Sequence, residues 1–419
     1  MRKLFIILSC AITFSAFAQP ADKVLSKAEL LKTPEKLGSI YYAYPGPQQE
    51  LLSDAPKGYT AFYISHYGRH GSRFQPSDER YKFALDLFED SYQMNNLTPL
   101  GEDVMNRIHR LWVIARGNGG LLTKVGERQH QEIAARMFSR FPEVFATGKH
   151  IDARSSTVTR CKQSMEAFCG SLLKQDSLLN VTMDTKPEFM GYIANDTPEQ
   201  KAFEKNGEAW RDQWFEYEHA HINGMRLCKS LFKDTDGLDD YAVASNLYWL
   251  AEGMQDLPTD LSLIDLFTTE ELYNIWLTIN YRMYICNAAA PVANGIALEA
   301  AKPLLKNIIE KADEAIKGGG DCATLRFGHD SHLIRLLALM DIEGCGAEVT
   351  DVNDIEHNWQ DFYISPMAAN LQMIFYRNKQ GSVIVKFLHN ENEVTLPIKS
   401  FKGKYYKWND VKKYFLAKI

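Results

Sequence analysis

The chain has 419 residues, which exceeds the length at which one hydrophobic core usually stops growing. We therefore expect two domains, or one core with an insertion. Hydrophobic residues (45%) and charged residues (24%) occur in proportions that are ordinary for a soluble globular protein. The net charge of −6 provides no global positive field, so neither nucleic acid nor an anionic membrane is an expected partner. Any site for an anionic ligand must be locally basic.

The N-terminus has the pattern of a secretory signal peptide. Arg2 and Lys3 form a short positive region, and residues 4–17 are mostly apolar. Small residues at positions 16 and 18 predict cleavage after Ala18, so we interpret residues 1–18 as the leader. The apolar run is too short to be a membrane anchor. The mature protein is therefore expected to be periplasmic or secreted.

Export affects how the cysteines are interpreted. Cleavage would remove Cys10 and leave an even number of thiols, which predicts disulfides in an oxidising compartment. Cys161 and Cys169 are not expected to pair with each other, because they would lie about 12 Å apart on one helix. The sequence does not choose among the remaining pairings. The six residues concerned are Cys161, Cys169, Cys228, Cys286, Cys322 and Cys345.

The first half of the mature chain combines strand and helix patterns. Residues 61–67 are rich in aromatic and β-branched side chains and end at Gly68, which predicts a buried strand entering a tight turn. Residues 121–141 have apolar side chains at helical spacing, with Thr123 as the expected N-cap. Residues 150–156 predict a second strand that is followed by a helix.

The second half begins with a long helical stretch. Strand signals are weak in residues 197–308, where Trp, Tyr and Leu recur at helical spacing. Strand character returns at residues 323–327, directly before a helix that starts near His329. Residues 371–376 and 383–388 flank a turn and predict a hairpin.

These elements predict an α/β fold. We expect a layered core with a mainly parallel central sheet flanked by helices, built from residues 19–196 and 309–419, and a mainly helical inserted domain at residues 197–308. Ligands bind at the carboxyl ends of the strands in such sheets. The segments after strands 61–67 and 323–327 are therefore expected to face each other across one crevice.

The segment after the first of these strands carries a nucleophile between two cations. A neutral imidazole, here that of His70, is a competent nucleophile towards phosphorus. Arg69 and Arg73 supply permanently charged, bidentate donors that suit a phosphoryl group. Gly71 lets the backbone turn sharply and approach a ligand closely. A solvated basic loop is the alternative, and the position after a buried strand makes it the weaker one.

The segment after the later strand carries an acid. Asp330 can protonate a leaving oxygen if its pKa is raised or if the enzyme works at acidic pH. His329 beside it can donate to a phosphoryl oxygen. Taken alone, an Asp between a strand and a helix is usually an N-cap. Only the pairing with Arg69 and His70 favours catalysis.

Together these segments resemble a known family, the histidine acid phosphatases of branch 2 of the histidine phosphatase superfamily. The order in which the motifs occur is more specific than any one of them. They are RHGSR (69–73), similar to the RHGxRxP signature; LTxxGxxQ (122–129); the segment from Arg154 to Arg160, followed by Ser164; FGHDS (327–331), similar to the His-Asp motif; and the tail at 366–378 and 383–397.

The resemblance implies roles for particular residues. His70 would be the nucleophile and Asp330 the general acid, with water then hydrolysing the phosphohistidine. Arg69, Arg73, Arg160 and His329 would hold the phosphoryl group. No metal or other cofactor is expected, and the partner would be a small-molecule phosphate monoester. One departure from the signature is Gln75, where the family has Pro, and this concerns substrate contacts rather than chemistry.

The resemblance leaves the substrate open. Residues 41–74 resemble bacterial proteins similar to multiple inositol polyphosphate phosphatases, whereas the His-Asp motif and the tail are closer to glucose-1-phosphatases and His-Asp phytases. We favour inositol polyphosphates such as phytate, with glucose-1-phosphatase or broad-specificity acid phosphatase as the alternative. Lys149, Lys162 and Arg211 are the candidate donors to further phosphates.

Three other functions fit the sequence less well. A metal-dependent phosphohydrolase would need further His and Asp ligands than the flanking sequence of the His-Asp pair presents. A branch 1 mutase usually has Glu after RHG, where this chain has Ser72. A non-catalytic protein that binds phosphate esters would lack the nucleophile or the acid, and both His70 and Asp330 are present.

Overall fold

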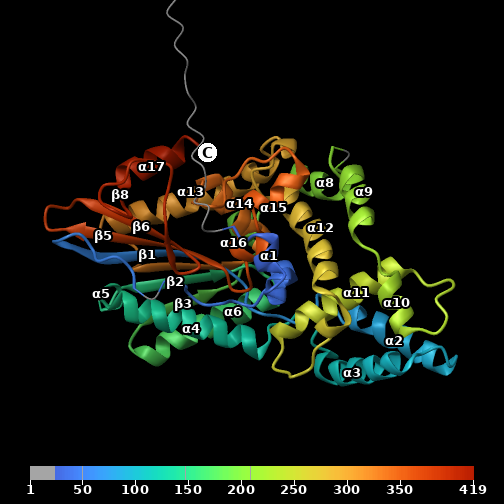
Figure 1. Ribbon diagram of the computed structural model, residues 1–419. Coiled ribbons are helices and arrows are strands. Elements are labelled where there is room, and N and C mark those ends of the chain that lie inside the picture. Colours follow the sequence, from blue (N-terminus) through green and yellow to red (C-terminus); the bar gives the residue numbers. More distant parts are fainter. Residues whose placement is uncertain (1–23, 50, 147, 208) are drawn as a thin grey trace, which may run out of the picture.

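A computed structural model describes residues 24–419 except residues 50, 147 and 208. The predicted leader and its cleavage site lie outside the described residues. In the described part of the chain, eight strands form one sheet in the order β3-β2-β4-β1-β5-β6-β7, with β8 paired to β6 (Figure 1). The strands are β1 (Tyr59–Arg69), β2 (His150–Ser155), β3 (Asn180–Asp184), β4 (Ala323–Gly328), β5 (Asn370–Asn378), β6 (Val383–His389), β7 (Asn392–Val394) and β8 (Tyr405–Lys407).

The predicted α/β core with a central sheet flanked by helices is confirmed, but the sheet is mixed rather than mainly parallel. Strands β1 to β4 run parallel, whereas β5 lies antiparallel to β1, and β6, β7 and β8 continue in antiparallel pairs. The reason is the length of the connections. Short turns after β5 and β6 can join only antiparallel strands, while parallel neighbours need a long crossover.

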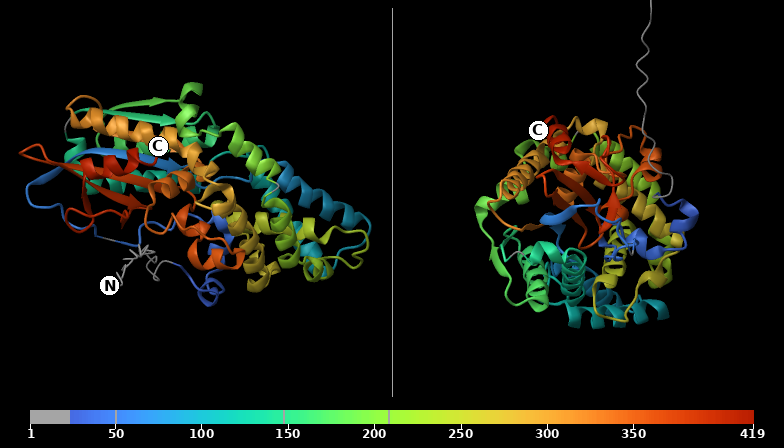
Figure 2. Two further views of the ribbon diagram at one scale, coloured as in Figure 1. Left: turned by 90° about the horizontal axis from the view of Figure 1, so that it is seen from above. Right: turned by 90° about the vertical axis from the view of Figure 1, so that its left-hand side faces the viewer.

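Helices cover both faces of the sheet (Figures 1 and 2). One face packs against α4, α5 and α6, and their Ile133, Met137 and Phe168 share a hydrophobic cluster with strand residues such as Ile64 and Leu325. The helices are α1 (Lys27–Leu30), α2 (Glu79–Gln93), α3 (Pro99–Ala115), α4 (Lys124–Arg140), α5 (Pro142–Phe145), α6 (Thr159–Gln175), α7 (Met190–Ile193), α8 (Pro198–Asn206), α9 (Arg211–His221), α10 (Met225–Leu231), α11 (Asp240–Gly253), α12 (Thr269–Asn287), α13 (Ile296–Ile316), α14 (Asp330–Met340), α15 (Ile355–Asn358), α16 (Asp361–Ile364) and α17 (Trp408–Leu416).

The opposite face packs against α13, α14 and α17. Leu305, Leu336 and Phe415 from these helices share a second cluster with Tyr63 and Phe387 of the sheet. The period-2 pattern of β1 explains this layering, because alternate side chains of a strand point to opposite faces. Ile64 joins the first cluster and Tyr63 the second.

Residues 197–308 contain helices and no strand in the part that the structure describes. A third hydrophobic cluster unites their helices α10, α11 and α12 with α2 and α3 from the first half of the chain. Figure 2 shows these helices together on one side of the sheet. Helix α13 instead packs on the sheet. The division of the chain at residues 197 and 308 therefore remains a prediction.

The structure contradicts the predicted disulfides. Among the residues that it describes there is no disulfide bond, and Cys161, Cys169, Cys228 and Cys286 are free and buried. Cys169, Cys228 and Cys286 lie in three different hydrophobic clusters, where each thiol packs as a small apolar side chain. Burial raises the pKa of the Cys169 thiol to about 12, which keeps it protonated and unreactive.

Candidate active site

The carboxyl ends of three neighbouring strands form the candidate site. Arg69 of β1 lies opposite Gly328 of β4, and Ser155 of β2 lies opposite Phe327. The backbone N–H of His70 donates to the Gly328 carbonyl at 3.0 Å, which joins the two strand ends directly. The structure thus brings together the two segments that we expected to face each other, although they are far apart in the sequence.

The loop after β1 is held against the first turn of α4. A Cβ atom at Gly71 would lie 2.7 Å from the Gly126 carbonyl oxygen, and one at Gly126 would lie 2.2 Å from the Ser72 carbonyl oxygen. The close approach of a helix therefore requires glycine at position 71, where φ is not positive. Gln129 completes the contact, since its side chain accepts from the Ser72 N–H at 2.9 Å and donates to Ser72 Oγ at 2.8 Å. Thr123 is the predicted N-cap of α4.

His70 is held as a neutral imidazole. Its side chain is buried, and Nδ1 lies 2.9 Å from the Gly71 carbonyl oxygen. A carbonyl oxygen only accepts, so Nδ1 carries the proton and Nε2 keeps its lone pair. Burial lowers the pKa of His70 well below its usual range, and the charges of Arg160, Arg69 and Arg73 lower it further. The ring is thus in the form that can attack phosphorus.

The arginines around His70 have polar hydrogens without acceptors. Within the described part of the chain, the buried Nε atoms of Arg69, Arg73 and Arg160 and Nη2 of Arg69 have no hydrogen-bond partner. Other atoms of the same side chains are held firmly, since Arg69 Nη1 donates to the carbonyls of Ile40 and Ser365 at 2.7 and 2.6 Å. Buried donors are usually paired. These N–H groups are therefore available to an anionic ligand, with Arg69 Nη2 shared with the Asp330 carboxylate.

His329 and Arg160 stand on the far side of this group. His329 Nε2 lies 3.1 Å from Ser156 Oγ, and Arg160 Nη2 lies 3.5 Å from His329 Nδ1. The His329 ring is 5.8 Å from the His70 ring, centroid to centroid. Burial lowers the pKa of His329 to about 3, and the charge of Arg160 acts in the same direction. His329 is therefore neutral and can donate one N–H.

Asp330 is the first residue of α14, and its carboxylate faces Arg69. Oδ2 lies 3.2 Å from Arg69 Nη2, and Oδ1 accepts from the Ser331 N–H at 2.8 Å. Burial by itself would raise the pKa of Asp330, but Arg69 and His329 outweigh it and lower the pKa below its usual value. From the sequence, activity near neutral pH required a raised pKa of Asp330. In the unliganded protein the pKa of Asp330 is instead lowered, because Arg69 stabilises the ionised carboxylate.

Sequence reasoning missed two residues beside the site. Asp256 ends a short 3-10 helix at Met254–Asp256, is fully buried, and accepts from Ser72 Oγ at 2.5 Å through Oδ1. The Tyr41 hydroxyl accepts from Arg73 Nη1 at 2.9 Å, and the Arg73 guanidinium lies 4.7 Å from the Tyr41 ring centroid. No local motif marks either residue, so only their position in space reveals them.

The basic residues considered for further phosphates lie in different places. Lys149 precedes β2 at the opposite end of that strand from the site. Lys162, in the first turn of α6, is exposed and lies 3.9 Å from Glu166. Arg211 begins α9 and is exposed.

In the described residues, no group of three or more His, Cys, Asp and Glu side chains is arranged to hold a metal ion. No helix of this part of the chain is long and apolar enough to cross a membrane.

The sequence profile of the histidine phosphatase superfamily (branch 2) matches residues 68–390. The chain belongs to this family. The match includes the Arg69–Arg73 segment and the His329–Asp330 pair, and it confirms the resemblance inferred from their order. It also separates this histidine phosphatase from the branch 1 mutases. A search of the curated proteins gave no match.

Solved structures of similar fold were found. The multiple inositol polyphosphate phosphatase of Bifidobacterium longum in complex with inositol hexasulfate has a TM-score of 0.77 and 19% identity, covering 91% of this chain and 97% of that one. Its phosphate complex has a TM-score of 0.74 and 20% identity, with 91% and 98% covered. The phytase from D. castellii has a TM-score of 0.67 and 17% identity, with 97% and 89% covered. At these identities the likeness establishes the fold.

Proposed function

We propose that this histidine phosphatase hydrolyses phosphate monoesters through a phosphohistidine formed on Nε2 of His70. The observation that carries the proposal is the set of buried arginine N–H groups without acceptors around a neutral imidazole. Fixed donors of this kind stabilise the charge that develops on phosphoryl oxygens. A protein that only binds phosphate esters would not need the lone pair of Nε2 within the same clamp.

The reaction would proceed in two steps. Nε2 attacks phosphorus, the bond from phosphorus to the ester oxygen breaks, and Asp330 gives that oxygen a proton. Water then attacks the phosphohistidine, which releases inorganic phosphate and restores His70. A bound phosphoryl dianion competes with Asp330 for Arg69 and places negative charge beside the carboxyl group, which raises its pKa. Substrate binding would thus prepare the acid that the unliganded site keeps ionised.

The proposed leaving group is a ring polyol, a class that includes the inositol polyphosphates favoured by the sequence and the sugar phosphate that was its alternative. The solved structures named for inositol polyphosphates support the first member through their fold. The positions of Lys149 and Arg211 give no further support for an inositol polyphosphate substrate. We also propose export, which rests on the predicted leader at residues 1–18 and no longer on disulfides.

Replacement of His70 by Ala tests the proposed reaction. Turnover should fall by on the order of 10⁴-fold or more, because no other group can accept the phosphoryl. The wild type, quenched after mixing with substrate labelled with ³²P, should yield an acid-labile phosphoenzyme that the variant lacks. Normal turnover in the variant, with an unchanged circular dichroism spectrum, would rule out the mechanism.

A second test addresses the role of Asp330. Asp330→Asn should slow hydrolysis of an alkyl phosphate by about 10²- to 10⁴-fold, since a poor leaving group needs its proton. Hydrolysis of a nitrophenyl phosphate should decline far less, because the phenolate leaves without protonation. Equal losses in kcat on both substrates would show that Asp330 only positions the phosphoryl group.

A further inference from the structure

A cavity of about 290 Å³ opens beside the phosphoryl clamp. Side chains from the loop after β1 and from helices α9, α11 and α12 line it, so it lies between the sheet end and the helical region. Its aromatic residues are Tyr41, Trp214, Tyr241 and Trp249. Isoleucines and one methionine add aliphatic surface, and the polar members of the wall are Arg73, Arg80, Glu218, Ser245, Thr278 and Arg282. The cavity therefore combines apolar faces with a smaller set of polar and charged groups.

Arg73 belongs to both the clamp and the cavity. Its guanidinium lies against the Tyr41 ring, and Tyr41 packs on Trp249 at 5.1 Å between centroids. Gln75, which departs from the family signature, holds this wall by accepting from the Tyr41 hydroxyl at 3.1 Å and donating to the Trp249 carbonyl. A phosphoryl group on Arg73 therefore directs its leaving group into this cavity.

Glu218 of α9 is the unusual member of the wall. Apart from Arg73, it is the only charged side chain that is buried among the described residues lining the cavity. The other cations of the wall, Arg80 and Arg282, are exposed, and Arg282 lies 5.7 Å from the Trp214 ring centroid. Burial raises the pKa of Glu218, although Tyr241 and the charges of His219 and Arg282 act in the opposite direction. This environment disfavours a negative charge even with Arg282 nearby.

We propose that the cavity binds an uncharged ring polyol, so that the substrate is a sugar monophosphate, and that Glu218 discriminates against a second phosphate on the ring. The inference rests on the proposed hydrolysis at His70 and specifies its leaving group. The Glu218 carboxyl, together with Ser245 and Thr278 in the same wall, offers hydrogen bonds to hydroxyl groups. The aromatic rings offer flat apolar faces to the C–H groups of a sugar ring.

Two physical terms oppose a polyphosphorylated ring in this cavity. An ionised Glu218 repels a second dianion, and burial raises the cost of adding another negative charge beside it. Arg73 is already engaged in the clamp, and the other two arginines of the described wall, Arg80 and Arg282, are exposed, so water and salt screen their attraction for a second phosphate. The volume of about 290 Å³ lies at the lower end of the range of roughly 300–1,000 Å³ found for ligand pockets. It suits a single ring better than a ring that carries several phosphates.

The decisive experiment compares two substrates that share the glucose ring and differ by one phosphate, with phytate as the polyphosphorylated ring. Phosphate release is measured from glucose-1-phosphate, glucose-1,6-bisphosphate and phytate, with the wild type, Glu218→Gln and Glu216→Gln. Glu216 is an exposed residue of the same helix and provides the matched control. The wild type should favour the monophosphate over the bisphosphate at least about tenfold in kcat/KM, and Glu218→Gln should reduce that preference to about threefold or less. Glu216→Gln should behave as the wild type.

Inorganic phosphate as a competitive inhibitor separates the two proposals. It occupies only the clamp, so its inhibition constant should be the same in all three proteins. A wild-type preference for the bisphosphate or phytate, or an unchanged preference in Glu218→Gln, would overturn the assignment of the cavity while hydrolysis dependent on His70 continued. Absence of turnover on every substrate, even with phosphate bound, would instead reject the proposed function.

Discussion

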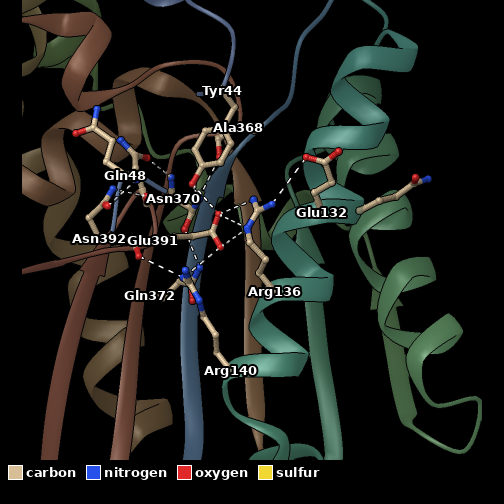
Figure 3. A network of polar contacts seen from close by, with 12 residues as sticks. Tyr44, Gln48, Glu132, Arg136, Arg140, Ala368, Asn370, Gln372, Glu391 and Asn392 are labelled. Atoms are coloured by element: carbon tan, nitrogen blue, oxygen red, sulfur yellow. Dashed lines mark hydrogen bonds and ion pairs between the residues drawn. The ribbon is translucent and has the colours of Figure 1, made fainter. Parts of the chain in front are cut away.

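Two groups of buried charge lie near opposite ends of helix α4, and they differ in how their hydrogen bonds are satisfied. Gln129, near the start of the helix, holds the loop of the clamp, where four buried arginine nitrogens have no hydrogen-bond partner within the described residues, although Arg69 Nη2 lies 3.2 Å from Asp330 Oδ2. Arg136 and Arg140, further along, face Glu391, which is buried (Figure 3).

The group around Glu391 is closed. Arg136 donates to its carboxylate through Nε at 2.9 Å and Nη2 at 2.7 Å, and the Tyr44 hydroxyl donates at 2.9 Å. Arg140 Nη1 lies 3.6 Å from Glu391 Oε1. Glu391 adopts a φ of +63°, a strained conformation for a residue with a side chain, so the surrounding contacts must hold it in place. Paired charges of this kind join elements of the fold, whereas the clamp arginines keep buried N–H groups without a hydrogen-bond acceptor in the described residues.

Breaking the closed group should have the largest effect on stability. Glu391→Gln leaves Arg136 and Arg140 without their buried counter-ion, which should cost about 3–5 kcal/mol of the free energy of unfolding. The kcat of the folded fraction should stay near that of the wild type. Glu132→Gln is the control, because Glu132 is exposed and lies 3.8 Å from Arg136. Its cost should be below about 1 kcal/mol by urea denaturation. Equal costs would remove the distinction between the two carboxylates.

Asp256 beside the clamp should instead make stability depend on pH. Burial raises the pKa of Asp256 to about 7, against the opposing effects of Ser72 and Arg73. Between the unfolded pKa near 4 and this value, the folded protein binds more protons, so this contribution to stability is complete below about pH 4 and lost as the pH rises through 7. The Asp256→Asn variant has no carboxyl group to ionise, so it does not lose this stability as the pH rises. It should therefore exceed the wild type in stability at pH 8 by up to about 4 kcal/mol and match it near pH 4.

The measurement is urea denaturation of both proteins across that range, and the difference between them isolates Asp256 from the buried histidines. A constant difference at all pH values would show that Asp256 does not titrate there.

Changing an unpaired cation of the clamp should affect activity and leave stability almost intact. Arg160→Gln removes one donor from the proposed phosphoryl site, which should lower kcat/KM by about 10²- to 10³-fold. It relieves crowding among positive charges, so the melting temperature without phosphate should not fall. Arg154→Gln is the control, since Arg154 lies on the neighbouring strand but is paired with Asp152 at 2.9 Å. The comparison would fail if Arg160→Gln lost stability and kept its activity.

Features that depend on residues close together in the sequence were predicted correctly, whereas most features that depend on contacts between distant residues were not. The strand at β1, the Thr123 N-cap and the candidate residues from Arg69 to Arg73 could be predicted because each depends on neighbours within a few residues. That the segments after β1 and β4 lie together followed from a general rule about strand ends, whereas the direct pairing of the two strands was not predicted. The disulfides were predicted wrongly, because an even number of cysteines says nothing of which hydrophobic cluster encloses each thiol.

The sequence by itself determined the candidate groups of the site: a histidine between two arginines at the end of a buried strand, and a His-Asp pair at the end of another. The proposed chemistry uses their own functional atoms, so residue type and local backbone are sufficient to identify them as candidates. Only the tertiary structure decided the charge state of Asp330, the contact of Asp256 with Ser72, and the position of Glu218 in the cavity. Burial and electrostatic fields depend on every element packed around a group, and that arrangement exists only in the folded chain.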